Sequence, residues 1–100
     1  MDPEIPGLQI SDVVISLRGR DQGELFYVVG MQEQYLLLAN GKNRTLEEPK
    51  RKKHKHVEKV LRSETRVAAK LLSGDKVLNG ELRRDLAFLS RGMQANDLGG

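Results

Sequence analysis

Residues 10–39 read ISDVVISLRGRDQGELFYVVGMQEQYLLLA, and this stretch decides the fold. Its apolar residues fall into three short runs that are rich in β-branched and aromatic side chains. Such runs predict strands over residues 10–17, 24–31 and 35–39. Residues 18–23 contain two glycines and an aspartate and predict a loop, and the polar residues 32–34 predict a turn.

The sequence after the third run predicts further short strands. Asn40-Gly41 is a strong hairpin signal, because both positions tolerate the positive φ that a tight turn demands. Residues 44–46 would then return as a strand, which Pro49 would end. After a basic run, residues 56–61 favour a closing strand. Short strands spaced this closely indicate a small closed or nearly closed β-barrel over residues 9–60.

Beyond residue 60 the apolar spacing changes to that of helices, and residues 61–92 predict two short ones. The first has its apolar face at Val67, Ala68, Leu71 and Leu72. We expect Ser63 to cap its beginning and Gly74 to follow its end. These helices would pack on the barrel or offer a face to a partner.

The second predicted helix carries a leucine stripe at positions 78, 82, 86 and 89. Asn79 suits its N-cap, Glu81 its first turn and Gly92 its C-terminal end. Residues 1–8 contain two prolines and no apolar period, so we expect a flexible tail there, and a disordered tail over residues 93–100.

Composition excludes several classes of protein. The 100-residue chain has no cysteine, which excludes a disulfide framework and any thiolate ligand or nucleophile. No stretch reaches the length of a membrane span, and the acidic N-terminus does not resemble a secretory signal. We therefore expect a cytoplasmic protein without a membrane partner. No catalytic constellation is evident, so we expect no enzyme, no cofactor and no small-molecule substrate.

The positive charge of the chain is concentrated in one segment. The net charge is only +3, but residues 42–62 contain nine Lys and Arg against three Glu. Residues 1–17, in contrast, contain three acidic residues and no Lys or Arg. Localised positive charge favours a polyanionic partner.

Two segments resemble the KOW family. The first is SLRGRDQGELFYVV at residues 16–29, which is similar to the family's strand, Gly-Arg-Asp-x-Gly loop and apolar strand. The second is GKNRTLEEPKRKKHKH at residues 41–56, which resembles the basic stretch of the fourteen-e family of the large ribosomal subunit. Short bacterial KOW-domain RNA-binding proteins are also similar. The sequence departs from the family at Asn40, where Asp is usual.

The resemblance implies a KOW-type SH3-like β-barrel followed by a short helical tail. It implies an RNA-binding protein, associated with ribosomal RNA or ribosomal proteins, in translation or ribosome assembly. Since some KOW modules bind proteins, the alternative is a protein-interaction module with a ribosomal or transcription partner. DNA is a weaker candidate, because no groove-reading helix is evident.

The candidate RNA-binding residues lie in the loop over residues 18–23, just after the Asn40-Gly41 turn and in the basic run, with Tyr27 on the second predicted strand. Arginine presents a planar fork that matches phosphate, and each lysine that meets phosphate releases counterions. The histidines can stack on bases. We expect RNA contacts from Arg18, Arg20, Tyr27, Lys42, Arg44, Lys50, Arg51, Lys52, Lys53, His54, Lys55 and His56. The solvated alternative for Arg18 and Arg20 is pairing with Asp21 and Glu24.

Other residues are expected to shape the site. Asp21, Gly23, Asn40 and Gly41 suit the turns, and Asp21 could also orient Arg20. Phe26 and Tyr27 must face opposite sides of their strand; Phe26 suits the core, and Tyr27 suits either the core or a stacking platform. His54 and His56 would share one face of a strand, but no third ligand is evident, so we expect no metal.

Overall fold

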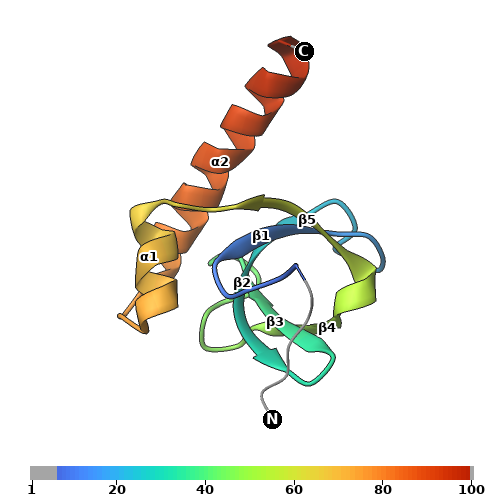
Figure 1. Ribbon diagram of the computed structural model, residues 1–100, viewed down its shortest axis with the longest axis vertical. Helices are drawn as coiled ribbons and strands as arrows, with labels where there is room; N and C mark the ends of the chain where they lie inside the picture. Colours follow the sequence, from blue (N-terminus) through green and yellow to red (C-terminus); the bar gives the residue numbers. More distant parts are fainter. Residues whose placement is uncertain (1–6, 100) are drawn as a thin grey trace.

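The computed structural model describes residues 7–99, with side-chain surroundings through residue 93. It contains one antiparallel sheet with the strand order β4-β3-β2-β1-β5, and two helices follow the sheet (Figure 1). The expectation of a mainly β protein with a helical C-terminal part is confirmed. The elements are β1 (Asp12–Ser16), β2 (Leu25–Gln32), β3 (Tyr35–Ala39), β4 (Lys50–Lys53), the 3-10 turn η1 (His54–His56), β5 (Val57–Arg62), α1 (Arg66–Ser73) and α2 (Asn79–Gly99).

The sheet bends around a first hydrophobic cluster, and η1 links its two edge strands (Figure 1). Two irregularities in strand register, after Val13 and after Val28, accompany the bend, as β-bulges generally do. Burial of the apolar side chains in this cluster stabilises the sheet through the hydrophobic effect. The buried members of this inner cluster are Val14, Phe26, Val28, Leu36, Leu38 and Val57.

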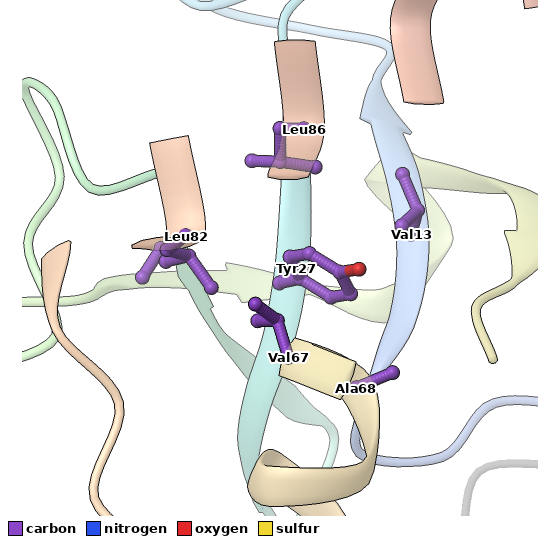
Figure 2. Close-up of a cluster of buried hydrophobic side chains, with 7 residues drawn as sticks. Val13, Tyr27, Val67, Ala68, Leu82 and Leu86 are labelled. Carbon is purple, nitrogen blue, oxygen red and sulfur yellow. The ribbon is translucent and has the colours of Figure 1, made fainter. Parts of the chain in front are cut away.

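The helices cover part of the outer face of the same sheet. Because successive strand residues point to opposite faces, Phe26 lies in the inner cluster while Tyr27 lies in a second one. Figure 2 shows Tyr27 surrounded by side chains from β1, α1 and α2. The helices thus pack on the sheet, one of the two arrangements considered for them. The buried members of this outer cluster are Val13, Tyr27, Ala39, Val67, Ala68, Leu82 and Leu86.

The segment between β3 and β4 differs from the predicted tight hairpin. Residues 44–46 form no strand, so that prediction is wrong. Instead, the side-chain oxygen of Asn40 accepts hydrogen bonds from the backbone N–H groups of Lys42 and Arg44, both at 3.0 Å. These bonds stabilise a wider loop. Of the two turn residues, Gly41 alone has a positive φ, 75°, and a Cβ there would lie 2.1 Å from the carbonyl oxygen of Asn79.

The strand that pairs with β3 comes from the basic run instead. Lys50–Lys53 forms β4, with Leu36 opposite Lys52 and Tyr35 opposite Lys53. Local propensity does not predict this strand, because lysine is depleted in strands. The strand predicted over residues 56–61 is confirmed as β5, which pairs with β1.

The helix boundaries correct two predictions and confirm a third. Thr65, not Ser63, caps α1: its hydroxyl accepts a hydrogen bond from the backbone N–H of Ala68 at 3.2 Å. Asn79 is the first residue of α2, and its side-chain oxygen accepts from the N–H of Leu46 at 2.8 Å, tying the β3–β4 loop to the helix. The end of α1 at Gly74, with φ 79°, is confirmed.

The helix α2 does not end at Gly92. It continues through Gly99, so the expected disordered tail is helical over residues 93–99, while residue 100 lies outside the described residues. A glycine inside a helix costs only about 1 kcal/mol relative to alanine, which good helix formers around it can offset. At the other end, residues 1–6 lie outside the described residues, and Leu8 packs against the inner cluster.

Candidate nucleic-acid interface

A buried carboxylate organises the loop between β1 and β2. Asp21 Oδ1 lies 2.7 Å from Lys52 Nζ and accepts a hydrogen bond from Ser16 Oγ at 2.7 Å, and Oδ2 lies 2.7 Å from Lys50 Nζ. Lys52 also donates to the backbone oxygen of Arg18 at 2.7 Å. These contacts join the loop to β4; we call them the Asp21 clasp.

The clasp holds Asp21 in its charged form. Burial alone would raise the pKa of this carboxyl group, but the hydrogen bonds from Lys50, Lys52 and Ser16 outweigh it and keep the pKa well below its usual range. The charge of Asp21 is therefore paired with the two lysines of β4. The sequence left open that Asp21 orients Arg20, but its ion pairs in the described residues are with Lys50 and Lys52 instead.

Two glycines give the loop its shape. Gly19 and Gly23 have φ values of 87° and 88°, in the left-handed region that residues with a Cβ rarely adopt. The N–H of Gly23 donates to the backbone oxygen of Ser16 at 2.8 Å, closing the loop at its base. The positive φ of Gly23 therefore favours a glycine at this position for conformational reasons.

The same loop lies against η1. The backbone N–H of Leu17 donates to the carbonyl oxygen of His56 at 2.9 Å. The pKa of His56 is lowered, first by its partial removal from water and then by the positive charges of Arg18, Lys55 and Lys53. Cations from two distant stretches of sequence are therefore close enough to act on one imidazole.

These residues form a basic surface at one side of the sheet. Arg18, Arg20, Lys53 and Lys55 are exposed, and His54 and His56 are partly exposed. Within residues 7–93, none of the four cations forms an ion pair with a carboxylate, whereas Lys50 and Lys52 do. We call the residues at or beside η1 the η1 surface: Arg18, Lys53, His54, Lys55 and His56. Arg20 is exposed in the same loop as Arg18.

An aromatic residue that the sequence did not single out adjoins the η1 surface. Tyr35 lies opposite Lys53 in the β3–β4 ladder, and the guanidinium carbon of Arg51 lies 4.0 Å from the centroid of its ring. Such a cation–π contact holds the guanidinium group in place. Tyr35 can be recognised as part of this surface only from the register of β3 against β4. The sequence did not predict β4, so it gave no such register.

Four of the expected RNA contacts lie elsewhere. Lys50 and Lys52 belong to the Asp21 clasp, and Lys52 is 7% exposed. Lys42 lines a shallow hollow beside α2 with Arg83, and Arg44 closes the β3–β4 loop through its backbone. None of the contacts of Lys42 or Arg44 in the described part of the chain reaches η1.

Tyr27 is also not a stacking platform. It is fully buried; its hydroxyl donates to the carboxylate of Asp85 and lies 2.8 Å from Ser63 Oγ, from which it can accept a hydrogen bond. Burial raises the pKa of Tyr27 to about 12, and the hydrogen bond to Asp85 adds to the effect. The ring therefore belongs to the contact between sheet and helices.

The two histidines do not share a strand face. His54 and His56 lie in the 3-10 turn, so the alternation that would have aligned them does not apply. Over the residues that the structure describes, no group of three or more His, Cys, Asp or Glu side chains could hold a metal ion.

Comparisons with known proteins add no family: the chain matches no known family profile and no curated protein sequence. In the described part of the chain, neither helix combines the length and the apolar character that crossing a membrane requires.

Proposed function

We propose that this chain is an RNA-binding protein built on an SH3-like barrel of the KOW type, and that its η1 surface binds ribosomal RNA. The five antiparallel strands, with a 3-10 turn between β4 and β5, support the barrel assignment. The role that follows is in translation or ribosome assembly, within the cytoplasm.

One observation carries the proposal. The Asp21 clasp pairs Lys50 and Lys52, yet Arg18, Lys53 and Lys55 remain exposed at or beside η1, and Arg20 remains exposed in the same loop as Arg18; none of the four has a carboxylate partner in the described residues. Exposed cations that repel one another favour an anion with closely spaced charges, and each phosphate they neutralise releases counterions. RNA offers such an array of phosphates.

Fluorescence anisotropy with a labelled ribosomal RNA hairpin tests this proposal. Binding should weaken steeply as salt rises from about 50 to about 200 mM. The double variant Lys53→Ala/Lys55→Ala should reduce the slope of log affinity against log salt by about 2, because two phosphate contacts are lost.

The matched control removes the same amount of charge elsewhere. Lys76→Ala/Arg84→Ala changes two exposed cations, one between α1 and α2 and one in α2, and Figure 1 shows these elements on the opposite side of the molecule from η1. Its salt slope should equal that of the unaltered protein. Absence of RNA binding at low salt, or equal slopes for both double variants, would refute the proposal and favour a protein partner instead.

A further inference from the structure

The outer face of the sheet has one covered part and one open part. At the covered part, Tyr27 and Ala39 lie beneath the helices in the outer cluster. Further along β3, on the same face, Tyr35 and Leu37 are only partly buried, and neither belongs to that cluster. The open part lies next to β4, whose residues alternate between the two faces.

One position of the open part has no side chain. Gly30 lies opposite Leu37 and carries no side chain; a Cβ there would meet the Leu37 side chain at 2.9 Å. Leu37 therefore lies over the glycine. Beside it, Arg51 is exposed, and its guanidinium group is positioned over the Tyr35 ring at 4.0 Å.

We infer that the Tyr35–Arg51 pair is a stacking site for an unpaired RNA base. Tyrosine rings and guanidinium planes are the groups on which splayed bases stack, and paired bases inside a duplex are not available to them. Lys53 lies opposite Tyr35 in the ladder, so a phosphate bound there would place the next base near the pair. The inference rests on the proposed function and narrows it to RNA with bulged or looped nucleotides.

The test compares two labelled RNAs with the full chain: a perfect duplex, and the same duplex with one bulged adenosine. The bulged RNA should bind about tenfold more tightly, a size typical of one base stacked on an aromatic or guanidinium group. Arg51→Lys keeps the positive charge but removes the plane, so it should abolish the preference and leave the salt slope unchanged.

Conservative variants separate stacking from folding. Tyr35→Phe keeps the ring and should retain the preference, whereas Tyr35→Leu should lose it. Because Arg51 is exposed, replacing it with lysine should leave the free energy of unfolding nearly unchanged, so a lost preference for the bulged RNA would report on stacking.

The outcomes distinguish this inference from the proposed function. If both RNAs bind with equal affinity, or if Arg51→Lys retains the preference, the stacking site is refuted while RNA binding stands. If neither RNA binds at low salt, the proposed function itself fails.

Discussion

At the scale of single residues, Asp21 decides which cations are structural and which are free. Its two carboxylate oxygens form ion pairs with Lys52 and Lys50, the lysines on the inner side of β4. The two arginines of its own loop remain exposed. A buried carboxylate without a cationic partner is strongly destabilising. The burial of Asp21, together with its attraction to the lysines, therefore keeps Lys50 and Lys52 paired with it. The loop that carries Arg18 is consequently held against η1.

The depressed pKa of Asp21 predicts a pH dependence of stability. The folded protein binds this proton more weakly than the unfolded chain, so the stabilisation is complete above the ordinary value of 3.8 and is lost as the pH falls below it. Asp21→Asn should therefore be less stable than the unaltered protein at neutral pH, and the difference should shrink in acid. Urea unfolding of both proteins at a series of pH values measures it; a difference that stays constant in acid would contradict the role of the clasp.

Tyr27 shows what single residues can and cannot reveal in advance. Strand alternation correctly places Phe26 and Tyr27 on opposite faces. The alternation does not say what covers the second face, because Ser63 and Asp85, which bind the hydroxyl, lie 36 and 58 positions away in the chain. Only the packing of the helices decides between core and platform.

At the scale of elements, β4 is the main departure from the sequence prediction. The strands β1, β2, β3 and β5 were predictable because β-branched and aromatic runs favour strands locally. The sequence of β4 is KRKK, and its pairing with β3 comes from non-local contacts. Charged side chains on an edge strand also discourage further strand addition.

Much of the candidate site was nevertheless predictable from charge. The basic run and the Arg18–Arg20 loop do meet at η1. Which lysines remain free was not predictable, since that depends on strand alternation in β4. Lys52 points inward to the clasp, and Lys53 shares the outer face with Tyr35.

This alternation predicts a large loss of stability at one lysine and almost none at its neighbour. Lys52→Met keeps most of the side-chain volume but leaves Asp21 without its buried lysine partner, so the free energy of unfolding should fall by about 3 kcal/mol. Lys53→Met, at an exposed position, should change it by less than about 0.5 kcal/mol. Urea unfolding measures both, and equal effects would mean that β4 does not present its residues as described.

At the scale of the whole molecule, the sheet has a hydrophobic cluster on each face, and the outer one exists only because the helices close it. A chain of 100 residues buries limited surface, so two small clusters that share one sheet are expected to support each other. The helices are therefore part of the folded unit that presents the η1 surface.

The leucine stripe of α2 offers a matched test of this coupling. Leu82 is 0% exposed in the outer cluster, whereas Leu78, the residue just before α2, is 55% exposed. Leu82→Ala should lower the free energy of unfolding by about 2–5 kcal/mol, because it leaves a cavity against the sheet, and Leu78→Ala should have little effect. Unfolding followed by tyrosine fluorescence, which reports on the sheet, and by helical circular dichroism should give coincident transitions for both variants. If Leu82→Ala instead melts the helices at a lower denaturant concentration than the sheet, then the sheet folds by itself and the helices are an appendage.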